Sequence, residues 1–167
     1  MAETAQEHAN PAARPFTTFN FVVEIKVDGV SDMIAAAAFS EVDGLEMTME
    51  TKTIREGGRN AGPIHLAGPV AYGQLTLKRG MTANQDFWGW FEAIASGGRR
   101  GLRAVADVVL YASDRSAERA RFTLTGCMPV KLKMPAMNAK DGLLAIEELQ
   151  LAYETLSIRP PVAAAGG

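Results

Sequence analysis

Few residues in this chain could carry out nucleophilic or metal chemistry. There is one cysteine, Cys127, and there are two histidines, His8 in the N-terminal stretch and His65 in a segment rich in Gly and Pro. A Cys-His nucleophile needs a base beside the thiol, and a zinc site needs three or four suitably spaced nitrogen or sulfur ligands. These residues fit neither pattern. We therefore expect no catalytic, metal-binding or cofactor-binding residues and no enzymatic activity, with Cys127 as a small buried residue.

Two other patterns resemble reactive sites only in part. Glu147 and Glu148 are adjacent, so on a strand they point to opposite faces and cannot share a substrate atom. We interpret them as surface or interface charges. The run Gly97–Arg103 is rich in glycine like a phosphate-binding loop, but it follows an expected helix instead of preceding one. We interpret it as a solvated turn.

One charged segment has no evident role in a folded core. Residues 55–60 read Arg-Glu-Gly-Gly-Arg-Asn, with two adjacent glycines between charged side chains. Such a segment cannot add to a core and is expected to be exposed. A long charged loop inside an otherwise compact chain is typical of a contact element. We therefore predict that this segment binds a partner.

Length and composition indicate one ordinary domain. The chain has 167 residues, 47% of them hydrophobic, and can bury a core without disulfides or metals. Its formal net charge of −2 argues against a protein that coats nucleic acid or an anionic membrane. A single cysteine cannot form an internal disulfide, which indicates folding in a reducing compartment. The N-terminal stretch has no apolar run of the length that a signal peptide needs, so we expect no export by that route.

Hydrophobic periodicity predicts mostly strands and one helix. Strands are expected at 16–27, 45–54, 70–78, 104–111 and 119–125, and residues 35–42 form a shorter apolar run. The helix is expected from Ala83 to Ser96, because Thr82–Gln85 fits a capping box and Gly97-Gly98 supplies a stop. Its apolar face, with i, i+3, i+4, i+7 spacing suited to packing on a sheet, is Phe87, Trp90, Phe91 and Ile94. Residues 143–155 are ambiguous: their Leu and Glu content favours a helix, whereas their alternation from Leu149 onward favours a strand.

The order of short motifs along the chain is more informative than any single motif. They are Glu41-Val-Asp-Gly-Leu45, Arg55-Glu-Gly-Gly58 with Asn60, Leu75-Thr-Leu-Lys-Arg-Gly80, Phe87-Trp-Gly-Trp90, Met128-Pro-Val-Lys131, Asn138-Ala-Lys140 and the segment Ala145–Glu154. In this order, over about Phe16 to Ile158, they resemble the tail tube protein family of contractile phage tails and phage-like contractile injection systems. The chain departs from the family pattern at Leu66-Ala67-Gly68, where Leu-Pro-Gly is usual, at Met128-Pro129 and at Tyr153-Glu154.

The resemblance implies a fold and a domain division. The expected fold is mostly β: a two-sheet β-barrel with one flanking α-helix, similar to the hemolysin-coregulated proteins and assembling as hexameric rings. Residues 143–155 would then be a strand. The tail tube domain would span residues 16–158, between a flexible N-terminal segment, 1–15, and a flexible C-terminal tail, 159–167.

The resemblance also implies a structural function, that of an inner tube subunit whose hexameric rings stack into a hollow conduit inside a sheath. The implied partners are further copies of the chain, the sheath protein, baseplate and cap proteins, and cargo or nucleic acid in the lumen, without membrane insertion by this chain. Assembly would take place in the cytoplasm of the producing bacterium, as part of a phage-tail-like particle or virion tail. Two alternatives stay open: a tube-initiator, baseplate or cap paralogue with the same domain, and a secreted effector.

In this family the extended element near residues 45–69 reaches adjoining subunits. Charged loops suit repeated interfaces because complementary charges fix register. The residues expected to make inter-subunit contacts are Arg55, Glu56, Gly57, Gly58, Arg59, Asn60, Lys78 and Arg79.

Overall fold

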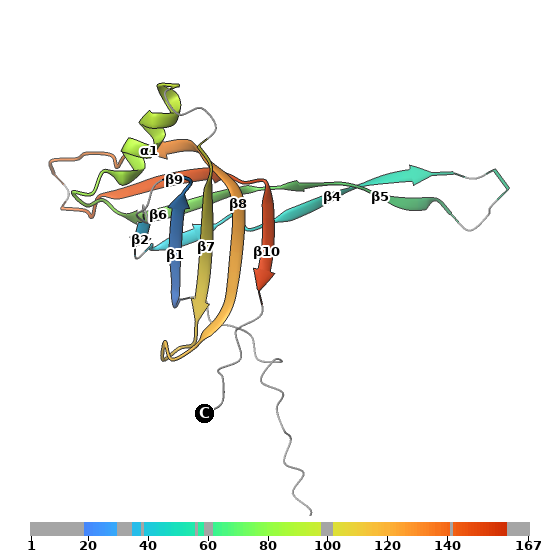
Figure 1. The fold of residues 1–167 in the computed structure, drawn as a ribbon, viewed down its shortest axis with the longest axis horizontal. Helices are drawn as coiled ribbons and strands as arrows, with labels where there is room; N and C mark the ends of the chain where they lie inside the picture. Colours follow the sequence, from blue (N-terminus) through green and yellow to red (C-terminus); the bar gives the residue numbers. More distant parts are fainter. Residues whose placement is uncertain are drawn as a thin grey trace, which may run out of the picture.

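The computed structural model describes residues 19–29, 35–37, 39–55, 57–58, 62–97, 102–140 and 142–159. In this part of the chain there are ten strands and one helix (Figure 1). Their bounds are β1 (Phe21–Val27), β2 (Ala35–Ala37), β3 (Glu41–Asp43), β4 (Met47–Ile54), β5 (Ile64–Tyr72), β6 (Gln74–Gly80), α1 (Asp86–Ala95), β7 (Ala104–Tyr111), β8 (Glu118–Lys133), β9 (Ile146–Ala152) and β10 (Thr155–Arg159). The helix is not long or apolar enough to cross a membrane.

Two antiparallel sheets share the long strand β8, as the resemblance implied. The strand order is β2-β1-β7-β8-β9-β6-β3, and β10 also pairs with β8. The first part of β8, up to Cys127, pairs with β7, whereas the part from Met128 onward pairs with β9. Between them, Gly126 has a φ of 65°, and a Cβ there would lie 2.6 Å from the Glu154 side chain. A glycine is therefore required where β8 passes from one sheet to the other.

The core lies between the two sheets and under the helix. Strand alternation places one face of each strand inside. The buried side chains include Val23, Ile25 and Val27 of β1, Leu75 and Leu77 of β6, and Leu149 and Leu151 of β9, each at most 1% exposed. Phe87 and Trp90 of α1 join this cluster, and Phe87 stacks on Phe39 with ring centroids 6.1 Å apart. A single continuous apolar core therefore stabilises the barrel.

The helix begins later than the sequence predicted. Its N-cap is Gln85, which makes no side-chain capping bond, so the expected capping box is wrong. Instead, the Asn84 side-chain oxygen accepts a hydrogen bond from the Asp86 N–H at 2.9 Å. At the other end Gly97 has a φ of 72° and donates to the Ile94 carbonyl, as a glycine stop does. The predicted apolar face lies toward the barrel, with Phe87 and Trp90 buried and Phe91 and Ile94 partly buried.

The ambiguous segment is extended, as the resemblance implied. Its central part is β9, which pairs with β6 on one side and with β8 on the other. Backbone hydrogen bonds from two neighbouring strands outweigh the helix propensity of Leu and Glu. The strand expected at 70–78 is divided at Gly73, where β5 ends and β6 begins.

Strands β4 and β5 form a separate two-stranded antiparallel ribbon, which we call the arm. In Figure 1 the arm extends away from the barrel. At about 3.3 Å per residue, the eight residues of β4 span roughly 25 Å. Arg55, Gly57 and Gly58, the described residues of the charged segment, lie at the far end of the arm.

Candidate inter-subunit contact site

The arm exposes apolar side chains that a protein normally buries. Every residue of β4 is exposed, and so are six of the nine residues of β5. The exposed fractions are 61% for Met47, 53% for Met49, 44% for Ile54, 45% for Leu66 and 43% for Val70. An isolated two-stranded ribbon is marginally stable in water, and its unpaired edges invite pairing with other chains. The arm is therefore a strong candidate for a contact element.

A change of register divides the apolar side chains of the arm between its two faces. Near the barrel Met47 pairs with Tyr72 and Met49 with Val70, and farther out Ile54 pairs with Ile64. Between these parts β5 has an extra residue near Gly68 and Pro69, a bulge in which a proline is tolerated. Because side chains alternate along β4, Met47 and Met49 lie on one face and Ile54 lies on the other. The arm can therefore contact a partner on either face.

The base of the arm is held firmly by the barrel. The Tyr153 hydroxyl accepts a hydrogen bond from the Glu46 N–H at 3.1 Å and lies 2.8 Å from the Gly44 carbonyl oxygen. Gly44 has a φ of 92°, and a Cβ there would lie 1.9 Å from the Gln74 carbonyl oxygen, so no other residue fits. The Asp43 carboxylate accepts a hydrogen bond from the Gly44 N–H at 2.7 Å. The direction of the arm is thus set by contacts with β6 and the end of β9.

Three residues of the charged segment predicted to bind a partner are described, and they lie at the far end of the arm. Arg55, Gly57 and Gly58 are exposed, and Gly58 has a φ of 99°. Glu56, Arg59 and Asn60 lie outside the described residues. For the described members, position and exposure suit the contact role, which stays a prediction.

The two basic residues predicted as contacts on β6 have different surroundings. Lys78 is at the surface, where its ammonium group donates to the Glu41 carboxylate at 2.9 Å. This hydrogen bond raises the pKa of Lys78 above its ordinary value. Arg79 is buried, forms an ion pair with Glu147 and lies 3.8 Å above the Phe87 ring centroid. Arg79 therefore lies in the core of its own subunit, and its inter-subunit role stays a prediction.

The burial of Glu147 corrects the interpretation of the two adjacent carboxylates as surface or interface charges. Glu147 is 5% exposed, whereas Glu148 lies on the outer face, as expected for alternating side chains. Arg79 and Glu147 are direct cross-strand partners. Strand parity could have revealed the pair, because Arg79 has the parity of Leu77 and Glu147 has the parity of Leu149. Because both side chains are charged, they were expected at the surface despite their inward parity.

The two described candidate chemical groups, Cys127 and His65, lie on different parts of the molecule. Cys127 is buried, and burial raises the pKa of its thiol to about 11, so at neutral pH it is protonated and a poor nucleophile. His65 lies on the arm, with its Nδ1 atom 3.4 Å from the Thr53 hydroxyl. His8 lies outside the described residues. Within the described ranges, no group of three or more His, Cys, Asp or Glu side chains could hold a metal ion.

Comparisons with known structures show the same fold in two components of phage-like particles and in Hcp1. A chain from the anti-feeding prophage baseplate, solved with 6-fold symmetrisation, matches at a TM-score of 0.78 and 24% identity, over 89% of this chain and 97% of that one. A chain from the sheath-tube complex of PVC, an extracellular contractile injection system, matches at 0.74 and 16%, over 89% and 94%. Hcp1 from Flavobacterium johnsoniae matches at 0.54 and 15%, over 82% and 94%.

Comparison of the sequence with curated proteins finds no match. The family model described as T4-like virus tail tube protein gp19, in contrast, matches residues 17–157. This range includes the whole barrel except the last two residues of β10, and the complete arm. The chain therefore belongs to the family of the T4-like virus tail tube protein gp19.

Proposed function

We propose that this protein is the tube subunit of a contractile injection system or contractile phage tail. Six copies would join head to tail into a ring, and rings would stack into a hollow tube. The observation that carries the proposal is the exposed apolar arm, which a monomer cannot cover. Family membership supports the tube assignment, and the 6-fold symmetrised baseplate structure supports the ring size.

A closed ring would explain why the exposed arm is tolerated. Head-to-tail contacts repeat one heterologous interface, and closure of the ring leaves no interface free. In such a ring, arm edges that would promote aggregation of a monomer lie against neighbouring copies. The charged end, with Arg55 and the residues that follow it, would fix the register between copies more than it adds affinity.

In this proposal the tube is a passive conduit, assembled in the cytoplasm of the producing bacterium. A sheath would surround it, as the sheath-tube complex of PVC suggests, and would supply the work of penetration. Cargo or nucleic acid would pass through the lumen, so no catalytic residue is needed. Baseplate and cap proteins would close the two ends of the tube.

Deletion of Gly57–Arg59 tests the proposal. The barrel does not depend on these residues, so the variant should fold as a monomer with an unchanged circular dichroism spectrum and fail to polymerise. Electron microscopy and light scattering measure ring and tube formation. The matched control replaces three residues of another exposed turn, Asp114–Ser116 between β7 and β8, with Gly-Ser-Gly and should still assemble. Normal tubes from the deletion variant would contradict the proposed role of the arm.

A second candidate function is a tube-initiator or baseplate paralogue, because one of the structural matches comes from a baseplate. The two functions differ in copy number and position. A main tube subunit should be present many times along the particle, whereas an initiator should form one ring at one end. Quantitative mass spectrometry of purified particles distinguishes them.

A further inference from the structure

A pocket of about 320 Å³ lies beside the start of α1, at the end of the molecule opposite the arm. In Figure 1, α1 and the segment between β8 and β9 occupy this end. Small-molecule sites in proteins have volumes of roughly 300–1,000 Å³, so this pocket is at the lower end of the range. It therefore has room for a ligand of about the size of one substituted aromatic ring.

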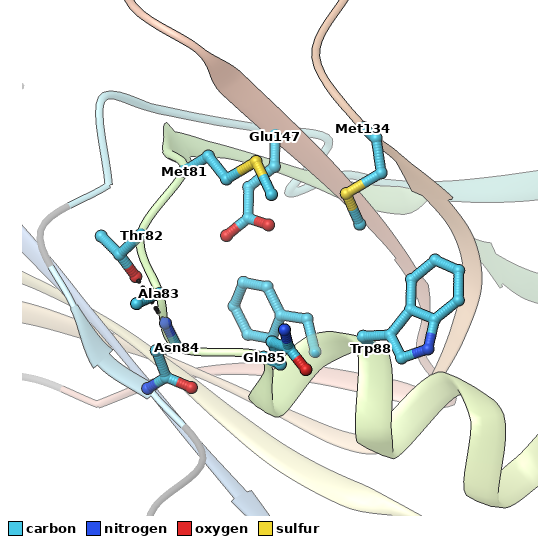
Figure 2. A pocket seen from close by; sticks show the side chains of 9 residues that line it. Met81, Thr82, Ala83, Asn84, Gln85, Trp88, Met134 and Glu147 are labelled. Carbon is cyan, nitrogen blue, oxygen red and sulfur yellow. Dashed lines mark hydrogen bonds between the residues drawn. The ribbon is translucent and has the colours of Figure 1, made fainter.

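The larger side chains around the pocket are apolar. Figure 2 shows Met81, Met134 and Trp88 around the space, and the buried Phe87 also lines it. Thioether and indole groups make favourable contacts with an aromatic ring. An apolar ligand would also replace water on these walls. The walls therefore favour a ligand whose main part is an apolar ring.

One buried charged side chain is directed into the pocket. Glu147 is 5% exposed, and Figure 2 shows its carboxylate directed into the space. The Arg79 Nε–H donates to one carboxylate oxygen, Oε1, whereas no hydrogen bond among the described residues uses the other oxygen, Oε2. The Arg79 Nη2 atom is buried and also has no partner in the described part of the chain. The ion pair therefore neutralises its own charge but keeps unused hydrogen-bonding capacity.

The exposed charges at this end of the described chain favour neither a cation nor an anion. Two carboxylates lie on α1, Asp86 and Glu92, and two ammonium groups lie at the end of β8 and after it, Lys133 and Lys140. Equal numbers of opposite charges do not steer a charged ligand toward the pocket. A charged ligand would also lose its hydration beside an ion pair that is already neutral. The electrostatics therefore favour a neutral ligand.

We propose that this pocket binds a small neutral molecule of the phenol class, with an apolar ring and one hydroxyl group. The ring would lie among Met81, Met134 and Trp88, and the hydroxyl would donate a hydrogen bond to Glu147 Oε2. A hydrogen bond to an ionised acceptor is stronger than one between neutral groups. The inference goes beyond the proposed function and does not depend on it, because a passive conduit needs no small ligand.

Titration of the full chain with three matched probes tests the ligand chemistry. The probes are 4-ethylphenol, ethylbenzene, which lacks the hydroxyl, and 4-ethylbenzoate, which has a carboxylate in its place. Ligand-observed NMR should give a Kd on the order of 1 mM for 4-ethylphenol. The other two should bind at least about tenfold more weakly, because ethylbenzene lacks the hydrogen bond and 4-ethylbenzoate places a second carboxylate against Glu147. Equal affinities for the three probes, or no saturable binding of 4-ethylphenol, would overturn the proposal.

Substitutions in the walls locate the binding site. Trp88 and Met81 are 54% and 44% exposed, so Trp88→Ala and Met81→Ala should keep the circular dichroism spectrum of the folded chain. Each should weaken 4-ethylphenol binding at least about fivefold, because apolar contacts with the ring are lost. The matched control is Met137→Ala, an 85% exposed position at the same end that does not line the pocket, and it should change the Kd less than about twofold. If the control loses as much affinity as the wall variants, the probe binds the exposed surface and the pocket assignment is wrong.

Discussion

The barrel and the arm are both antiparallel β-structure, but only the barrel encloses a buried core. In the barrel, Leu75, Leu77, Leu149 and Leu151 are at most 1% exposed. In the arm, Leu66 and Met47 are 45% and 61% exposed, and every residue of β4 is exposed. The barrel strands pair on both sides where β7, β8, β9 and β6 lie next to one another, whereas each arm strand pairs on one side.

The difference separates folding from assembly within one chain. A strand with a buried face gains free energy from its own subunit, whereas an exposed ribbon gains it only when another surface covers it. Substitutions in the barrel should therefore change the free energy of unfolding of the monomer. Substitutions in the arm should change assembly and leave that free energy nearly unaltered.

The largest expected effect is on the buried ion pair of the barrel. Glu147→Ala leaves the Arg79 guanidinium buried without its partner and should lower the free energy of unfolding by about 3–5 kcal/mol. Urea denaturation of the monomer measures this loss. The double variant Arg79→Met, Glu147→Leu removes both charges and should lose much less. A loss below about 1 kcal/mol for Glu147→Ala would mean that the pair is not a structural element.

The next effect compares the two regions with one type of substitution. Leu75→Ala opens a cavity in the core and should cost about 2–5 kcal/mol. Leu66→Ala removes the same atoms from the exposed arm and should change the free energy of unfolding of the monomer by less than about 0.5 kcal/mol. Parallel denaturation curves at a concentration below that of assembly provide the comparison. Similar costs at both positions would show that the arm folds against its own subunit.

A smaller expected effect is the pH dependence of the free energy of unfolding, which arises from Cys127 in the barrel. Burial raises the pKa of Cys127 from 9.0 to about 11, so the thiol ionises in the unfolded chain before it ionises in the native protein. The resulting stability is fully present below about pH 9 and is lost as the pH rises toward 11. The loss should amount to about 2–3 kcal/mol. Cys127→Ala lacks this thiol and should show a correspondingly shallower decline in denaturation experiments over the same range.

The smallest effect concerns the joint between the two regions. Tyr153→Phe removes the hydroxyl that contacts Gly44 and Glu46 and should cost about 1 kcal/mol. Because the lost contacts hold the base of the arm, amide hydrogen exchange at Glu46 should become faster while exchange in β9 stays slow. Unchanged exchange at Glu46 would show that other contacts set the direction of the arm.

The success of the sequence predictions depended on how local their signals were. The apolar face of α1 follows from spacing within one helix, and the glycine stop after it follows from one residue. The capping box predicted at Thr82–Gln85 is wrong, although both residues have suitable side chains. The first turn of the helix is instead capped by the Asn84 side chain, which accepts a hydrogen bond from the Asp86 N–H. The surface position expected for Glu147 is wrong because its charge is compensated by Arg79, which has matching parity on the paired strand.

The sequence by itself determined which residues alternate, which face of the helix is apolar and, through the order of its motifs, the family. Each of these depends on the spacing of nearby residues or on the order of motifs, and both can be read from the sequence. Only the tertiary structure decided that the strand expected within residues 143–155 is bounded by Ile146 and Ala152, that Arg79 and Glu147 meet in the core, and that β4 and β5 leave the barrel. All three depend on pairing between segments distant in the sequence, and the hydrogen bonds and burial supplied by a distant strand are not encoded in local propensity.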